Sequence, residues 1–343
     1  MHVLIIGGTG FVGAHVVRRL IEDGHRVTLF HRGQTNADLP VTVSHLYGAR
    51  EALLGFVTTF KQVSPRIVLD MFPYIEQDAV NVVQAFRGIA ERLIAISSMD
   101  VYRAYGIFLR LDDGVPDVKP FAENAPLRKS LYPYRSMAQK AGDLLYNYEK
   151  MLIEKIVMGE TDLPATVLRL PQVYGPRDQL HRLFDYFKRM EDGRSFILLD
   201  EAKANWRWTR GYVENVADAI ALAVINDRAT GRIYNVGEEH ALTELAWVQK
   251  IGEAAGWKGE IRIVPKDLLP KHLDEPYDWR QHLAADTSRI RQELSYQECV
   301  DHGQALKRTL EWERGNPRGE FDVNRFNYGA EDDALKRYCR YPN

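Results

Sequence analysis

The chain has 343 residues, of which 45% are hydrophobic and 27% charged, and its formal net charge is −2. This composition is typical of a soluble globular protein, and the length accommodates two lobes that share a cleft. The near-neutral charge gives no electrostatic reason to expect nucleic-acid or membrane binding. With only two cysteines, no apolar run of about 18 residues and no signal peptide, we expect a cytoplasmic protein with free thiols.

The first predicted element is a short apolar strand over residues 1–6, followed by Gly7-Gly-Thr-Gly-Phe-Val-Gly13 and a helix over residues 14–23. Gly7 lets the chain turn tightly out of the strand, Gly10 leaves room for a pyrophosphate, and Gly13 lets the helix pack on the sheet. The helix N-terminus offers free N–H groups to phosphates. This order predicts a dinucleotide site. Its expected cofactor contacts are Gly7, Thr9, Gly10, Phe11, Val12 and Gly13.

Apolar runs and amphipathic stretches then alternate along the first half of the chain. The predicted strands cover residues 27–31, 41–46, 66–71, 93–98 and 165–170. The predicted helices cover residues 50–61, 75–88 and 137–159. This alternation predicts right-handed βαβ units, and therefore an α/β fold with a Rossmann-type, doubly wound parallel sheet.

After residue 170 the pattern loosens. Helices are predicted over residues 178–192, 214–226 and 243–255, and short strands over residues 196–199, 233–236 and 261–265. We expect residues 1–170 to form the dinucleotide-binding domain, with the catalytic residues. Residues 171–343 are expected to form mainly a smaller α+β substrate lobe and a tail, with the chain crossing back to the sheet.

Two serines end the fifth predicted strand, in the segment Ile96-Ser-Ser-Met-Asp-Val-Tyr102. Because residues past the carboxyl ends of parallel strands line the ligand crevice, Ser97 and Ser98 are expected near the nicotinamide. Further along, Tyr146 and Lys150 are four residues apart, so on a helix they would share one face. A lysine beside a tyrosine lowers the pKa of the phenol, which suits it to proton exchange with a substrate hydroxyl.

Together, Gly-x-x-Gly-x-x-Gly, Ser-x-x-Val-Tyr and Tyr-x-x-x-Lys resemble the extended short-chain dehydrogenase/reductases, and more narrowly the NAD-dependent epimerase/dehydratase family. Three later segments also resemble that family, which extends the resemblance to about residue 310: residues 173–176, 210–218 and 234–237. The resemblance implies that Ser98, Tyr146 and Lys150 form the catalytic triad. It also implies that Pro171 and Val173 lie beside the nicotinamide.

The resemblance and the neighbouring residues also indicate a substrate site. The residues expected to line it are Ser97, Asp100, Tyr134, Arg207 and Arg210. The segment 206–210 is rich in tryptophan and arginine, and one of its arginines would clamp a substrate phosphate. Either Arg207 or Arg210 matches the family arginine, and in the alternative interpretation the tryptophans are core and the arginines are solvated.

The second predicted strand ends in Leu29-Phe-His-Arg-Gly33, where users of NAD usually carry an acid that binds the ribose. His31 takes the place of that acid, and Arg32 offers a guanidinium to a 2′-phosphate. We therefore expect NADP rather than NAD as the cofactor. In the alternative interpretation Arg32 stacks on the adenine, which is compatible with both cofactors.

One departure from the family limits the reaction. The resemblance aligns Ser98-Met99-Asp100 with the Thr-Asp-Glu of sugar-nucleotide 4,6-dehydratases. Since Met99 cannot donate a proton, dehydration by that route is disfavoured. The following loop, residues 103–131, is long, so the mouth of the substrate site is expected to be individual to this protein.

We therefore expect an NAD(P)-dependent oxidoreductase or epimerase that acts on a hydroxyl or ketone carbon by Tyr-Lys-Ser assisted hydride transfer. The resemblance implies a nucleotide-sugar substrate and a homodimer formed through helices 75–88 and 137–159. One alternative is a reductase of a non-sugar metabolite, and another is a non-catalytic dinucleotide-binding or RNA-associated regulatory protein. The scattered histidines predict no metal site.

Overall fold

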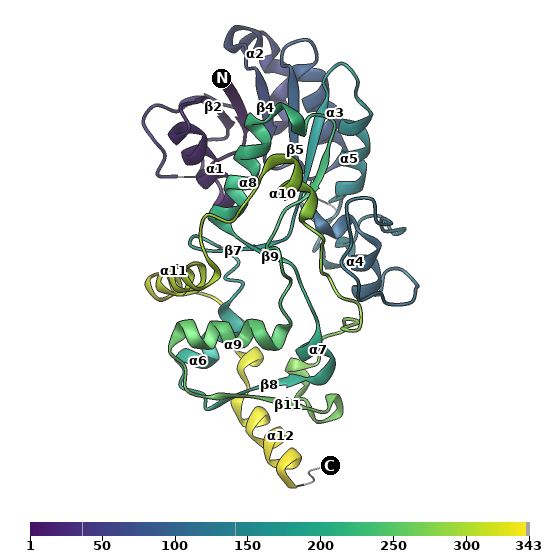
Figure 1. Cartoon of the computed structure of the whole chain (residues 1–343), viewed down its shortest axis with the longest axis vertical. Helices are drawn as coiled ribbons and strands as arrows, with labels where there is room; N and C mark the ends of the chain where they lie inside the picture. The colour runs from purple at the N-terminus through teal and green to yellow at the C-terminus, as the bar shows by residue number, and fades with distance from the viewer. Residues whose placement is uncertain (36, 141, 341–343) are drawn as a thin grey trace.

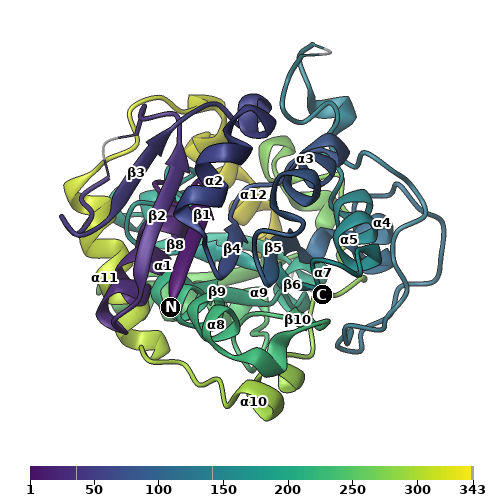
Figure 2. The same cartoon turned by 90° about the horizontal axis from the view of Figure 1, so that it is seen from above.

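The computed structural model describes residues 1–35, 37–140 and 142–340. Its centre is a seven-stranded sheet with the strand order β10-β6-β5-β4-β1-β2-β3 (Figures 1 and 2). All of its neighbouring strands run parallel. Its strands are β1 (His2–Ile6), β2 (Arg26–His31), β3 (Ser44–Tyr47), β4 (Ile67–Asp70), β5 (Arg92–Ser98), β6 (Ala165–Leu170) and β10 (Ile233–Asn235). The strand order reverses between β1 and β4, which places a ligand crevice at their carboxyl ends.

Both faces of the sheet are covered, which explains why its strands are apolar at nearly every position. Along β1, Val3 and Ile5 belong to one core and Leu4 belongs to the other, as the two-residue period of a strand requires. The first core is closed by α1 (Phe11–Glu22) and α8 (Val213–Ile225). The second is closed by α2 (Val57–Val63), α3 (Glu76–Phe86) and α5 (Lys150–Gly159). The predicted Rossmann-type fold is confirmed.

The second half of the chain forms a smaller α+β lobe, which Figure 1 shows below the sheet. There β8 (Phe196–Asp200) pairs in parallel with β11 (Glu260–Val264), while β7 (Gln172–Tyr174) pairs with β9 (Arg210–Tyr212) nearer the sheet. The remaining helices are α4 (Arg103–Phe108), α6 (Phe184–Glu191), α7 (Glu201–Asn205), α9 (Glu244–Ala255), α10 (Ser288–Leu294), α11 (His302–Gly315) and α12 (Tyr328–Arg340). Because α8 and β10 return to the sheet, the lobe is tied to it at several points.

The helix predicted over residues 137–159 is wrong in its first half, since α5 begins only at Lys150. The cause is Glu149, whose backbone is extended and whose carboxylate accepts the backbone N–H groups of Met151 (3.0 Å) and Tyr132 (2.7 Å). A carboxylate that caps the helix N-terminus in this way also fixes where the helix starts. The segment before Glu149 therefore turns instead of continuing the helix.

Two other predicted helices differ from the helices of the structure. The helix predicted over residues 178–192 begins only at Phe184, because Arg177 and His181 adopt positive φ angles of 72° and 49°, which a right-handed helix does not accommodate. The helix predicted over residues 50–61 divides into a 3₁₀ turn, Arg50–Phe56, and α2. The predicted strand over residues 41–46 is found at β3, slightly later in the chain.

The polar tail folds back on the second lobe, where α12 is the yellow helix near the C-terminus in Figure 1. Glu331 of α12 is fully buried, and its carboxylate lies 2.7 Å from Nη2 of Arg189 on α6. His272 Nε2 lies 3.1 Å from the same carboxylate oxygen. Removing one partner of such a buried pair leaves the other charge without compensation.

We predict that Glu331→Gln destabilises the protein by about 3 kcal/mol, because Arg189 stays buried without a counter-charge. Thermal unfolding measures the loss, and hydrogen exchange of α12 shows whether the tail detaches first. The matched control is Asp333→Asn on the same helix, whose exposed pairing with Lys336 is worth about 0.5 kcal/mol or less. Equal midpoints for both variants would contradict this reading of the tail.

Candidate functional site

The glycine-rich turn between β1 and α1 forms an open cradle at the carboxyl edge of the sheet. Gly7 and Gly8 have positive φ angles of 91° and 87°, which side-chain-bearing residues rarely adopt. A Cβ on Gly13 would lie 2.7 Å from the Cα of Gly8, so the helix packs directly on the turn. A Cβ on Gly10 would meet no atom within 4 Å. The backbone at Gly10, where α1 begins, is therefore accessible, and the turn fits a pyrophosphate.

At the end of β2, His31 and His45 lie beside each other, with His31 Nε2 at 2.9 Å from His45 Nδ1. Burial and the neighbouring His45 lower the pKa of His31, so its ring is neutral at pH 7. The Tyr47 ring centroid is 5.1 Å from that of His31. Arg32 is exposed and, within the described ranges, forms no ion pair. This end of the crevice is therefore aromatic and basic.

The loop after β4 is held by Arg50, whose Nη1 lies 2.8 Å from Asp70 Oδ1 and whose Nε lies 2.8 Å from Asp78 Oδ1. This loop carries Pro73, whose carbonyl oxygen accepts a hydrogen bond of 2.5 Å from Lys150 Nζ. Sequence reasoning missed this support, because Arg50 and its two carboxylates come from three separate elements.

Lys150 is buried at the first position of α5, where its Nζ also donates to the Ile96 carbonyl at 3.0 Å. Two of its three N–H groups are thus satisfied by backbone oxygens. Burial lowers the pKa of Lys150 to about 8, although Asp100 and Asp70 oppose the shift. The aromatic rings nearest to its Nζ among the described cation–π contacts are Tyr74 at 5.4 Å and Tyr148 at 5.7 Å.

Tyr146 does not share a helical face with Lys150, because it precedes α5. Its ring instead lies 4.7 Å from the guanidinium of Arg135, and Arg135 Nε donates to its carbonyl at 2.9 Å. The prediction that the two residues are adjacent on a helix is therefore wrong. The catalytic role of Tyr146 stays a prediction, without the geometry that motivated it.

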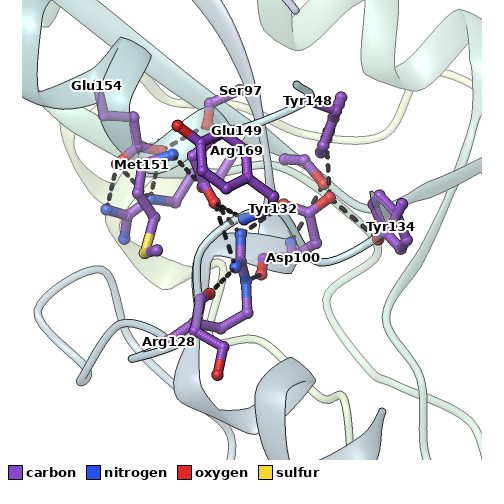
Figure 3. Close-up of polar contacts among 12 residues, drawn as sticks. Ser97, Asp100, Arg128, Tyr132, Tyr134, Tyr148, Glu149, Met151, Glu154 and Arg169 are labelled. Atoms are coloured by element: carbon purple, nitrogen blue, oxygen red, sulfur yellow. Dashed lines mark hydrogen bonds and ion pairs between the residues drawn. The ribbon is translucent and has the colours of Figure 1, made fainter. Parts of the chain in front are cut away.

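Asp100 instead receives two phenols, as Figure 3 shows. Tyr148 donates to Asp100 Oδ2 at 2.8 Å, and Tyr134 donates to the same oxygen at 3.1 Å. Arg128 Nη2 lies 4.0 Å from Asp100 Oδ1, and Arg128 Nε donates to the Asp100 carbonyl. Burial raises the pKa of Asp100, and Arg128 and the phenols partly offset this rise.

The two serines at the end of β5 point to different partners. Ser98 is partly exposed, and its Oγ accepts the backbone N–H of Asp100 at 3.1 Å. Ser97 is buried, and its hydroxyl donates to Glu154 at 2.6 Å, beside the Arg169–Glu154 ion pair (Figure 3). The predicted substrate contact of Ser97 is therefore wrong, since its hydroxyl is committed to this ion pair.

A cavity of about 360 Å³ reaches from the Asp100 cluster into the second lobe. Its lining includes five aromatic side chains and one arginine: Tyr105, Tyr134, Trp206, Trp208, Trp247 and Arg210. Its polar groups come from both lobes, so the cavity depends on how the second lobe sits on the sheet. The residues Pro171 and Val173 follow β6 at the same edge of the sheet.

The structure separates the two candidate arginines. Arg210 is buried in the cavity wall, 4.4 Å from the ring centroid of Trp247, and donates to Glu244 at 2.5 Å. Its Nε and Nη1 have no partner among the described residues. Arg207 is exposed, donates to the Ala241 carbonyl at 2.8 Å and is not among the residues that line this cavity, so its substrate contact stays a prediction.

The described ranges offer neither a metal centre nor a membrane anchor of the helical kind. Within residues 1–35, 37–140 and 142–340, no group of three or more histidine, cysteine, aspartate or glutamate side chains could hold a metal ion. No helix there combines the length and the apolar character that crossing a membrane requires.

The glycine cradle yields a paired prediction. Gly13→Ala should destabilise the protein by about 2 kcal/mol or more, because the new methyl group overlaps the Gly8 backbone. Gly10→Ala should leave stability nearly unchanged but weaken dinucleotide binding by about tenfold or more, because the methyl group occupies the open face. Thermal unfolding and NADPH fluorescence titration measure both effects. Unchanged dinucleotide affinity in the Gly10 variant would contradict the assigned cradle.

Comparison with known proteins agrees with this geometry. The pattern of the "NAD dependent epimerase/dehydratase family" matches residues 3–71 and 77–237. A UDP-N-acetyl-alpha-D-glucosaminuronate decarboxylase of Bacillus cytotoxicus is 24% identical, over 91% of this chain and 97% of its own length. The Arabidopsis thaliana chloroplast stem-loop binding protein of 41 kDa b is 24% identical, over 93% of this chain and 82% of its own length.

Among solved structures, the UDP-glucose 4-epimerase of Thermus thermophilus in complex with NAD superposes with a TM-score of 0.65. That likeness covers 92% of this chain and all of the other, at 22% sequence identity, and it shows the shared fold. The resemblance drawn from the sequence motifs is confirmed. Since the family pattern matches well over half of its residues, the chain belongs to the NAD dependent epimerase/dehydratase family.

Proposed function

We propose that the protein is an NAD(P)-dependent oxidoreductase or epimerase that acts on a hydroxyl or keto carbon of a nucleotide sugar. One observation carries the proposal: the glycine cradle, Ser98 and Lys150 occupy one edge of the sheet, and Asp100 connects that edge to the cavity through Tyr134. A bound nicotinamide ring would supply the hydride acceptor or donor. The protein itself has to bind, orient and move a proton.

Lys150 and Ser98 suit the orienting role. Since two N–H groups of Lys150 are held by backbone carbonyls, the third remains for a cofactor ribose hydroxyl. The Ser98 hydroxyl accepts one hydrogen bond from Asp100 and keeps its own proton to donate to a substrate oxygen. The same first step, oxidation of an alcohol, serves an epimerase and a dehydrogenase.

The cavity supports a nucleotide sugar as the substrate class. Trp208 and Trp247 offer flat apolar surfaces to a base or sugar. Arg210 offers phosphate oxygens the N–H groups of Nε and Nη1, two buried nitrogens that have no partner among the described residues. The bacterial decarboxylase and the epimerase to which the chain is similar carry UDP-sugars in their names, in agreement with this class. A non-sugar metabolite with an anionic group is the alternative.

A second candidate function is non-catalytic. One relative is named a stem-loop binding protein, which keeps an RNA-associated role as the alternative, although the net charge of −2 does not favour it. Titration with a fluorescent RNA stem-loop tests this role.

We also propose a cytoplasmic homodimer formed through α3 and α5, which pack against each other on one face of the sheet (Figure 2). Sedimentation equilibrium tests the dimer.

The proposed reaction predicts a specific loss in Lys150→Met. Without the ammonium group, hydride transfer from UDP-glucose should fall by about 10²-fold or more, and NADPH should bind more weakly. Stopped-flow absorbance of the reduced nicotinamide measures the rate. The control is Lys155→Met, an exposed position on the same helix. Equal rates in the two variants would exclude the proposed role of Lys150.

We further propose that NADP is preferred over NAD, because Arg32 and the His31–His45 pair replace an acidic residue at the end of β2. Arg32→Ala should weaken NADPH binding by about tenfold, as expected for one charge-assisted contact to a phosphate, with little change for NADH. Fluorescence titration with both cofactors measures the ratio. Tighter binding of NADH by the unmodified protein would contradict this preference.

A further inference from the structure

Two histidines lie side by side where the strands β2 and β3 end. His31 is the last residue of β2, and its Nε2 lies 2.9 Å from Nδ1 of His45 on the edge strand β3. The backbone N–H of Gly33 donates to the other ring nitrogen, His31 Nδ1, at 3.3 Å. Both nitrogens of the His31 ring are therefore in contact with polar groups of the protein.

These contacts define the tautomer of His31. Because a backbone N–H can only donate, Nδ1 is the acceptor in the contact with Gly33. The neutral ring then carries its proton on Nε2 and donates it to His45 Nδ1. A second proton on His31 has to bind at Nδ1, where it replaces only the long contact from Gly33. His45 accepts from Nε2 in both protonation states.

The free protein offers no anion that would stabilise this second proton. Burial and the neighbouring His45 lower the pKa of His31. Among the described residues, neither imidazole has a carboxylate partner. The other titratable or charged groups of the surrounding elements are Arg32 beside His31, Tyr47 on β3, and the pair formed by Asp38 of the following loop and Arg18 of α1. A bound dianion would supply the missing negative charge.

From this geometry we propose that His31 takes up a proton from solvent when the 2′-phosphate of NADP binds, with His45 as the positioning residue of its ring. The inference rests on the proposed preference for NADP. The charged ring donates Nδ1–H to a phosphate oxygen, together with the guanidinium of Arg32, while Nε2–H stays bound to His45. NAD has a hydroxyl group in place of this phosphate and leaves His31 neutral. The preference for NADP over NAD therefore increases as the pH falls.

The pH range of this effect follows from the two protonation equilibria involved. In the free protein the pKa of His31 lies below its ordinary value of about 6.5, and in the complex the phosphate dianion raises it. Because the complex binds the proton more tightly, the affinity for NADP increases as the pH falls through the raised pKa. A phosphate monoester itself takes up a proton near pH 6. The effect is consequently measured between about pH 8 and pH 6.5.

The first test is isothermal titration calorimetry with NADP and NAD, in buffers of different ionisation enthalpy that report proton uptake. From pH 8 to pH 6.5 the affinity for NADP should rise by about fivefold or more, and that for NAD should change by less than about twofold. His31→Gln should abolish this rise, and His45→Phe should at least halve the proton uptake. The matched control is His25→Gln, just before the opposite end of β2, which should keep the full rise.

Thermal unfolding and an unchanged affinity for NAD show that each variant is folded with an intact glycine turn. Equal proton uptake by the unmodified protein and His31→Gln would overturn the proposal. A preference for NADP that is the same at every pH, without proton uptake, would leave the proposed cofactor in place and exclude the role of His31.

The second test needs no dinucleotide and so separates this inference from the proposed function. Proton NMR follows the imidazole C–H signals, and His31→Gln identifies the signal of His31. Adenosine 2′-phosphate at millimolar concentration should raise the titration midpoint of His31, whereas adenosine 5′-phosphate should not. If the midpoint rises although NAD binds more tightly than NADP, the cofactor preference fails and the proton uptake stands. A midpoint that adenosine 2′-phosphate leaves unchanged would contradict the role of His31.

Discussion

A fully buried ion pair between Arg128 and Glu149 determines the geometry of the candidate site. Their charged groups lie 3.0 Å apart, and neither side chain is exposed. Glu149 caps α5 and thereby places Lys150 at its first position, while Arg128 lies behind Asp100 and binds its carbonyl. Because the two buried charges compensate each other, the loop that carries Arg128 and the start of α5 form one unit.

The site as a whole also depends on three other parts of the fold, which meet at the carboxyl edge of the sheet: the glycine turn, the loop after β4 and the second lobe. The glycine turn provides the open backbone at Gly10, and the loop after β4 holds Lys150 through Pro73. The second lobe closes the cavity with Trp247 and Arg210. The tail contributes indirectly, because Glu331 neutralises Arg189, which also lines the cavity. A substrate that spans this cavity would contact residues from both halves of the chain.

The sheet, its order of elements and the cradle could be predicted from the sequence, because they follow from local patterns. Apolar runs with two-sided burial and glycines at fixed spacing need no knowledge of distant contacts. The start of α5 could not be predicted, since it depends on Glu149 meeting Arg128 from another loop. Tyr148 was therefore missed, as the four-residue spacing assumed a continuous helix. For the same reason, only the folded cavity distinguishes Arg210 from Arg207.

The central claim is that the glycine turn, Lys150 and the cavity form one site for a dinucleotide and a nucleotide sugar. A crystal structure of the protein with NADP and UDP-glucose tests it most directly. The account predicts the pyrophosphate at the open backbone of Gly10, the Lys150 ammonium on the cofactor ribose, and the UDP phosphates at Arg210 in the cavity. A dinucleotide bound away from the glycine turn, or UDP-glucose bound outside the cavity, would contradict it.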